Sequence, residues 1–332
     1  MSAFAGRTVF HLNPDVVDAI ERLRERRILS DARAASLLRV YRGELVSVEP
    51  ELRAGLYVGV LLLVTGVGLF LKDNHERIGP AAIAVILGAA ALACLLYAWR
   101  RLPAFSWQSV PSPHVAADYV LLLGVLLAAA DLAWIETQFR LLGPNWAYHL
   151  LVVALLYLVA AYRFDSRAVL PLALSTFAAW RGVAVSLDFA LRGARATPAV
   201  RANALACGVL FIGAGILSVR ANRKAHFEPV WTTLGLLLFL GALVSGVFQY
   251  SGGEWLGWEV ALAACSGLVI ALAYRLRRVL ELSLGVLAAY LGLLRIMGPA
   301  IGGSLGFLIL AASSLGVVAL LVRLQRRMRE PA

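Results

Sequence analysis

Charged side chains inside long apolar runs are the residues of this sequence best placed to do chemistry. Arg181 lies about fourteen residues into the apolar run 168–190, and Asp188 follows seven residues later. In a helix this spacing puts both on one face, two turns apart. Asp131 lies near the end of another apolar run, 117–134. Such charges are costly in lipid and often functional, so they either pair across helices, line an aqueous cavity, or form a structural pair that fixes helix register.

Further polar residues gather toward the same end of the expected helices. They are Asp131, Glu136, His149, Asp188, Arg201, Asn203, Gln249, Glu254, Glu259 and Arg295. An outward-opening polar vestibule between the third to sixth and the eighth helices would explain this one-sided placement, and so would ordinary solvation at a membrane interface. The candidate intramembrane polar site consists of Arg181, Asp188, Asp131, His149, Arg201 and Glu259.

The remaining signals for catalysis or metal binding are weak. His149 could shuttle protons, although a lone histidine near an interface is more often simply hydrogen-bonded. Asp73, His75 and Glu76 offer three metal ligands within four residues but lack a second cluster. The chain has no nucleophile elbow, zinc-protease motif or phosphate-binding loop, and no histidine pair suited to haem. We therefore expect no enzyme, no cofactor and no metal.

Composition decides which solvent surrounds these residues. The chain is 61% apolar with a mean hydropathy of +0.79, well above a soluble protein. Its net charge is +11, but the charges sit in short clusters between apolar runs rather than in one patch. This pattern is typical of membrane topology signals and argues against a nucleic-acid partner. Three cysteines, Cys94, Cys207 and Cys265, lie inside apolar runs without disulfide or metal spacing.

Ten apolar runs follow residue 50, and most approach the length of about 20 residues that crosses a bilayer. Their approximate cores are 52–71, 79–98, 117–134, 145–162, 168–190, 199–219, 230–249, 256–274, 279–297 and 303–322. Because lipid offers no partner to unpaired backbone groups, each run must be helical. The sequence predicts an all-α polytopic bundle of about ten transmembrane helices over residues 51–323, followed by a basic cytoplasmic tail, 324–332.

Residues 1–50 predict a cytoplasmic helical hairpin. They contain no apolar core of a cleavable signal peptide. Asn13 and Pro14 can begin a first helix, and Ser30 can cap a second. Arginines crowd the hairpin, which suits contact with anionic membrane lipids; a docking surface for a cytoplasmic protein partner is the alternative.

Arginine and lysine placement predicts the orientation. With the N-terminus inside, 23 of the 31 basic residues fall in inner segments, seven fall in outer segments, and Arg181 lies within a run. This asymmetry places both termini in the cytoplasm and requires an even number of crossings.

The first hundred residues resemble a bacterial membrane family known as domain of unknown function 2157. The resemblance rests on the hairpin segments 23–31 and 34–38, and on the Gly-rich stretch 66–70 followed by a short polar turn, Asp73, Asn74, His75 and Glu76. His75 departs from the family, which tends to have Trp there. The resemblance covers about the first third of the chain and implies a multi-pass inner-membrane protein without supplying catalytic residues.

Three functions remain open at this point. The first is a non-enzymatic scaffold, sensor or regulator, and the second is a transporter or channel for a small solute through a polar cavity reaching Arg181. The third, a membrane-embedded transferase, would use the outer carboxylates. A solid bundle favours the first and a continuous polar cavity the second; the sequence does not indicate an oligomeric state.

Overall fold

The computed structural model describes residues 14–41, 49–110, 115–183, 197–250, 253–297 and 303–329. Within these ranges the chain is helical apart from its connections and contains no strand, which confirms the all-α prediction. It divides into two compact units, Met1–Gly66 and Val67–Ala332.

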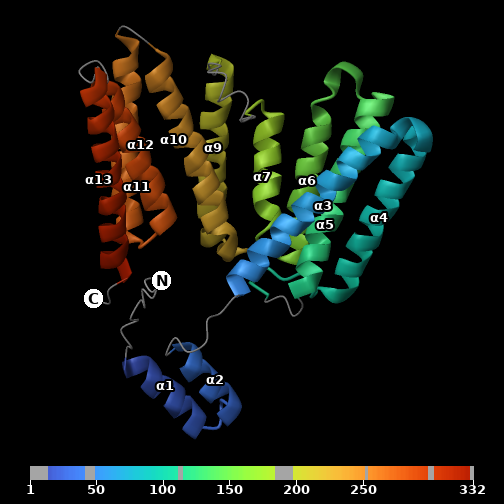
Figure 1. Ribbon diagram of the computed structural model, residues 1–332, viewed down its shortest axis with the longest axis horizontal. Coiled ribbons are helices and arrows are strands. Elements are labelled where there is room, and N and C mark those ends of the chain that lie inside the picture. Colours follow the sequence, from blue (N-terminus) through green and yellow to red (C-terminus); the bar gives the residue numbers. More distant parts are fainter. Residues whose placement is uncertain are drawn as a thin grey trace, which may run out of the picture. The chain divides into compact units, whose positions relative to one another are not determined.

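The first unit contains the predicted hairpin, formed by α1 (Pro14–Glu25) and α2 (Asp31–Tyr41) (Figure 1). Proline opens α1, where its missing N–H costs nothing. The turn is closed by an ion pair between Arg24 Nε and Asp31 Oδ1 at 2.7 Å, and Ala34 is fully buried. Helix α3 (Glu49–Ile78) begins in this unit and continues into the second.

Helices also make up the second unit. They are α4 (Pro80–Arg101), α5 (Val115–Phe139), α6 (Tyr148–Phe164), α7 (Val169–Trp180), α9 (Pro198–Arg220), α10 (Glu228–Gln249), α11 (Glu254–Arg275), α12 (Val279–Met297) and α13 (Gly303–Arg329), with short 3₁₀ turns at Gly143–Asn145 and Ala225–Phe227. Six of the described helices are long and apolar enough to cross a membrane, and four shorter apolar stretches lie in α3, α6, α7 and α13. Every predicted run thus contains an apolar helix, and the protein is membrane-embedded.

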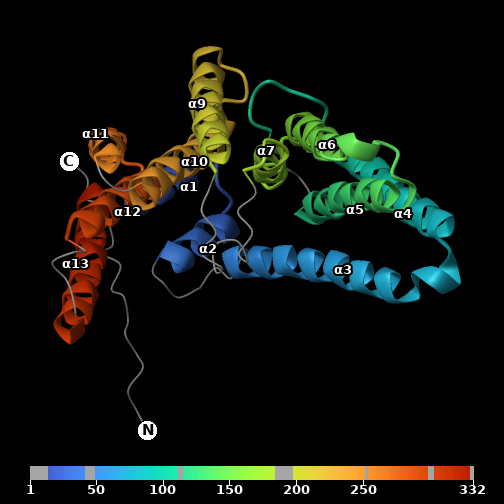
Figure 2. The same ribbon diagram turned by 90° about the horizontal axis from the view of Figure 1, so that it is seen from above.

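Helices that follow one another along the chain pack as antiparallel neighbours, as Figures 1 and 2 show for α4 with α5, α6 with α7, α9 with α10, and α11 with α12. Helix α10 also contacts α7, α11 and α12. A close backbone-to-backbone approach joins Gly208 of α9 to Gly235 of α10. A Cβ on Gly208 would lie 2.9 Å from the Gly235 carbonyl oxygen, and a Cβ on Gly235 would lie 2.9 Å from the Gly208 carbonyl oxygen. Small residues let two backbones meet in this way within a membrane bundle.

Three boundaries differ from the sequence prediction. Helix α3 runs through Ile78, so Asp73, Asn74, His75 and Glu76 belong to its last turns and the predicted polar turn is wrong. The Asn74 amide donates to the Phe70 carbonyl oxygen at 2.9 Å, which is helical geometry and lets a polar stretch continue the helix. Helix α7 ends at Trp180 instead of continuing past Arg181, and α13 extends through Arg329, inside the predicted tail.

Candidate functional site

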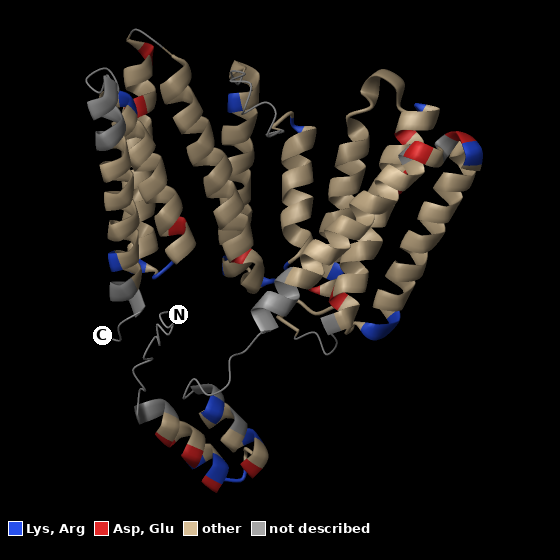
Figure 3. Ribbon diagram, in the orientation of Figure 1, with Lys and Arg blue, Asp and Glu red and all other residues tan. Residues whose placement is uncertain are grey.

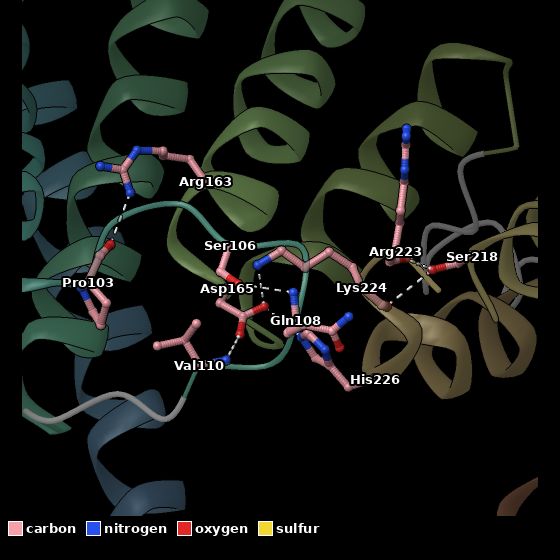
Figure 4. Close-up of polar contacts among 10 residues, drawn as sticks. All are labelled: Pro103, Ser106, Gln108, Val110, Arg163, Asp165, Ser218, Arg223, Lys224 and His226. Carbon is pink, nitrogen blue, oxygen red and sulfur yellow. Dashed lines mark hydrogen bonds and ion pairs between the residues drawn. The ribbon is translucent and has the colours of Figure 1, made fainter. Parts of the chain in front are cut away.

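A densely bonded polar cluster centres on Asp165, the residue that caps the C-terminus of α6 (Figure 4). Its Oδ1 accepts from Lys224 Nζ at 2.7 Å and from His226 Nε2 at 2.6 Å, and its Oδ2 accepts from the Val110 N–H at 2.7 Å. Lys224 is 1% exposed and the Asp165 side chain 10% exposed. We call these four residues the Asp165 clamp; they join three connections that are far apart in the sequence.

Local backbone geometry aims these side chains at one another. Asp165 has a φ of 59°, the left-handed conformation that often ends a helix and that Asp tolerates well. Lys224 has a φ of 51°, which is uncommon for a long side chain, and its N–H donates to the Trp107 carbonyl oxygen at 2.7 Å. Ser218 Oγ closes the end of α9 by donating to the carbonyl oxygens of Arg223 and Lys224.

Aromatic and cationic contacts fasten the connection between α4 and α5 around the clamp. Arg163 donates to the Pro103 carbonyl oxygen at 3.1 Å, and its guanidinium lies 4.2 Å from the Trp99 ring centroid. Arg223 lies 4.8 Å from the Trp107 ring, and Lys224 Nζ lies 5.5 Å from the Phe105 ring. A cation is attracted to the face of an aromatic ring. These contacts therefore hold the connection between α4 and α5 against the helix ends.

The electrostatics favour the ionised form of the Asp165 carboxylate. Burial by itself would raise the pKa of Asp165, but the hydrogen bonds from Lys224 and the Val110 N–H, with the charges of His226 and Lys224, outweigh it and lower the pKa below its ordinary value. Because both oxygens already accept hydrogen bonds, the geometry suits a static clamp rather than a proton-transferring group.

A second charged cluster lies at the same, Arg-rich end of the helices, which Figure 3 shows in blue and which we call the basic end. Arg278 donates to both carboxylate oxygens of Glu228, at 2.5 and 2.7 Å, and to Glu281 Oε1 at 3.0 Å. Thr232 Oγ1 adds a hydrogen bond to Glu228 at 2.9 Å. The cluster joins the start of α10 to the turn between α11 and α12, with bidentate geometry that a guanidinium suits best.

Arg181 was expected far from either end of a helix, and this is wrong: it caps the C-terminus of α7, directly after the last helical residue, Trp180. Its guanidinium donates to Asn203 Oδ1 at 2.8 Å, and the Asn203 amide donates back to the Arg181 carbonyl oxygen at 2.7 Å. Asn203 lies five residues after the start of α9, about 8 Å along that helix. The Asn203 amide therefore supplies a hydrogen bond to a backbone carbonyl at the end of α7. Lipid could not supply one.

Arg201, near the start of α9, is 3% exposed and fastens three helices at the end opposite the basic end. It donates to the Gln249 amide oxygen and lies 4.8 Å from the Tyr250 ring and 5.2 Å from the Trp258 ring. Tyr250 and Trp258 stack with their ring planes 5° apart.

The other predicted site residues are spread over several helix pairs. His149 and Glu136 line an open pocket of about 520 Å³ with Arg140 and Trp146, and His149 Nδ1 lies 2.5 Å from the Trp146 carbonyl oxygen. Asp131 lies against Gly88 of α4, and Glu259 lies against Gly292 of α12.

Among the described residues, no contact brings the six predicted site residues into one site. Asp188 and the side chain of His75 lie outside what the structure describes, so their predicted roles stay predictions. Among described residues, no group of three or more His, Cys, Asp or Glu side chains could hold a metal ion.

Sequence reasoning missed the Asp165 clamp because it counted Lys224 only as a topology charge. A usable signal was present. Asp165, Glu228 and Glu281 are single acidic residues beside the three later basic connections, each among several arginines or a lysine. An isolated acid in such a segment is a candidate for an internal ion pair.

Comparison with known proteins adds one finding. No curated protein matches the chain, and no solved structure matches it. The family resemblance is confirmed, and it extends past the first third of the chain to include Asp165 but not Lys224 or His226. Residues 21–170 match the model of a family described as a predicted membrane protein, domain of unknown function 2157.

Proposed function

We propose that this chain is a non-enzymatic scaffold or regulator of the bacterial inner membrane, with both termini in the cytoplasm. The observation that carries the proposal is that the polar clusters which bridge helices use their hydrogen-bonding groups on one another. The Asp165 clamp, the Glu228–Arg278–Glu281 cluster and the Arg181–Asn203 pair all join separate helices or connections. Groups arranged in this way fix helix positions instead of presenting a binding surface.

A transport pathway through Arg181 receives less support. Arg181 is engaged by Asn203 at the end of α7, and the two described pockets of the second unit are lined by other residues. One of these, about 160 Å³, is lined only by apolar side chains of α6, α7, α9 and α10. These observations favour the structural interpretation of Arg181.

The N-terminal hairpin is the part of the proposed scaffold that would meet the cytoplasm. Its arginines Arg22, Arg24, Arg26, Arg27, Arg33 and Arg39 accompany exposed apolar side chains at Leu23, Ile28 and Leu37. Basic residues mixed with exposed apolar ones suit an anionic lipid surface, where each Arg contributes about 1 kcal/mol. We propose that the hairpin binds the anionic inner leaflet.

Reporter fusions test the orientation. A cytoplasm-active reporter is expected to be active when joined to either terminus, and a periplasm-active reporter is expected to be active when inserted at Gly143 but inactive at Arg277. Activity of the periplasmic reporter at one terminus alone would require an odd number of crossings and would contradict the proposal.

Reconstitution of the full chain tests the hairpin. With the native cysteines replaced by Ala, an environment-sensitive dye at Ile28→Cys, which is 67% exposed, is expected to move into an apolar environment in anionic nanodiscs and to leave it in high salt. Arg26→Glu with Arg27→Glu should weaken this shift, while the matched pair Arg100→Glu with Arg101→Glu, outside the hairpin, should not. An equal shift in zwitterionic nanodiscs would rule out charge-driven lipid binding and redirect the search to a protein partner.

A further inference from the structure

Among the described residues, two carboxyl groups of membrane-crossing helices each have a buried oxygen atom with no hydrogen-bonding partner. The first is Glu259 of α11, which is 8% exposed and whose Oε2 is buried with no partner. It packs directly on Gly292 of α12, where an added Cβ would lie 2.5 Å from Glu259 Oε1. The absence of a side chain at Gly292 thus leaves room for the Glu259 carboxyl; Leu262 Cδ2 would also lie 3.1 Å from the added Cβ.

The same arrangement recurs in another helix pair. Asp131 of α5 packs on Gly88 of α4, where an added Cβ would lie 3.0 Å from Asp131 Oδ2. Its Oδ1 is buried and has no partner. The nearby Trp134 donates its indole N–H to the Pro80 carbonyl oxygen instead, at 3.0 Å. A carboxyl placed on a glycine of the adjacent helix, with an unpartnered buried oxygen, is therefore found twice.

Both carboxyl groups lie inside their helices rather than at the ends. Glu259 is five residues from the start of α11, about 8 Å along the axis, and Asp131 is eight residues from the end of α5, about 12 Å. Neither carboxyl group is therefore at a helix terminus, where unpaired backbone groups could bond it.

Cations lie on the helices around Glu259, but none of the described ones forms an ion pair with it. Arg295, three residues after Gly292 on α12, lies 5.9 Å from the Trp255 ring, and its Nε is buried with no hydrogen-bond partner. Arg201 of α9 lies over Trp258 and bonds Gln249. Glu228 on α10 and Glu281 on α12 belong to the basic end.

The charged groups on the helices around Asp131 likewise lie away from it or bond other partners. Arg100 and Arg101 end α4 at its far end, and Asp118 lies in the first turn of α5. Glu136, one turn beyond Asp131, accepts from the Leu142 N–H, and His149 of α6 lies beside Trp146 in the open pocket.

An ionised carboxylate at such a position would carry a large free-energy cost. Burying an unpaired charge costs far more than burying a neutral polar group, and proteins respond by neutralising the group. The contrast is clearest between Glu228 and Glu259, which are 7% and 8% exposed, because only Glu228 is held by a cationic donor. A carboxyl that lacks such a donor is stable at its position only with its proton.

We propose that Glu259 and Asp131 are intramembrane proton-binding sites, each a carboxylic acid held neutral on a glycine of the neighbouring helix. The ligand of each site is a single proton. This goes beyond a scaffolding role, because it gives the bundle two groups that exchange protons within the membrane.

An apolar carbodiimide, dicyclohexylcarbodiimide, tests the proposal on the full chain in membranes. The reagent reacts with protonated carboxyl groups: the acid proton moves to one carbodiimide nitrogen, the carboxyl oxygen bonds to the central carbon, and migration of the acyl group to nitrogen leaves a stable N-acylurea containing the whole reagent. Peptide mass mapping at neutral pH is expected to find this adduct at Glu259 and Asp131 and not at Glu228 or Asp165. Glu259→Gln should lose the first adduct alone, and Asp131→Asn the second alone.

Alkaline pH and a matched glycine pair supply the controls. Labelling should fall roughly tenfold for each pH unit once the carboxyl ionises. Gly292→Ala should displace Glu259 and change its labelling rate, whereas Gly257→Ala, with open space around the new methyl group, should not. A wild-type residue that stays unlabelled, that labels independently of pH, or that reacts instead with a water-soluble carbodiimide is not a neutral buried acid, and any of these results overturns the proposal for that residue.

Discussion

Replacing Asp165 with Ala is expected to lower the free energy of unfolding by about 3–5 kcal/mol, because it leaves a buried cation without its counter-ion. Lys224 is 1% exposed and its Nζ has Asp165 as its anionic partner at 2.7 Å. The Val110 N–H and His226 Nε2 lose an acceptor at the same time. Thermal unfolding in detergent would measure the loss, with the reactivity of the buried Cys207 thiol as the signal of unfolding.

A matched control separates this effect from the removal of any carboxylate. The ion pair of Arg24 with Asp31 has the same 2.7 Å separation, but its side chains are 54% and 84% exposed. Asp31→Ala should therefore cost at most about 1 kcal/mol. Equal losses for the two variants would show that the Asp165 clamp is not a buried ion pair in the membrane.

The pH dependence of the same variant follows from the lowered pKa of Asp165. A carboxyl whose pKa is lower in the folded state stabilises the fold above its unfolded pKa, and this contribution is lost as the pH falls through the folded value. The difference in stability between wild type and Asp165→Ala should therefore be full at neutral pH and should shrink in strong acid. A difference that grows on acidification would mean that the carboxylate is not stabilised by its neighbours.

The helices themselves were predictable because hydrophobic length is a one-dimensional property. Ten apolar runs and the Pro14 and Ser30 start signals gave the helices of both units. Boundaries were less accessible. A polar stretch such as 73–78 continues α3 where hydropathy alone ends it, because a helix satisfies its own backbone whether its side chains are polar or not.

The site was less predictable because it is a three-dimensional property. Arg181 and Asn203 are 22 residues apart, and Asp165 and Lys224 are 59 residues apart; only the packing of the helices and their connections brings each pair together. Residue type identified Arg181 as costly in lipid but could not show that α7 stops there. Sequence spacing likewise could not distinguish Glu259, which lacks a partner, from Glu228, which has a bidentate one.

The close approach of α9 to α10 gives the other large expected effect. Gly208→Ala would place a methyl group 2.7 Å from Phe239 Cβ and 2.9 Å from both the Gly235 carbonyl oxygen and the Phe239 nitrogen. Two of these atoms are backbone and cannot rotate away, so the helices must separate. A loss of about 1–3 kcal/mol is typical of such overpacking, and it should appear as a lower unfolding temperature in detergent.

Gly213, on the same helix, is the matched control for this substitution. Nothing lies within 4 Å of a Cβ added there, so Gly213→Ala should be neutral or slightly stabilising, since Ala loses less backbone entropy in a helix. Gly235→Ala should resemble Gly208→Ala, because its methyl group meets the Gly208 carbonyl oxygen at 2.9 Å. The double variant should cost less than the sum of the two, because helices already separated by one methyl group accommodate the second. Strict additivity, or a Gly213→Ala loss as large as that of Gly208→Ala, would show that α9 and α10 do not meet at these two glycines.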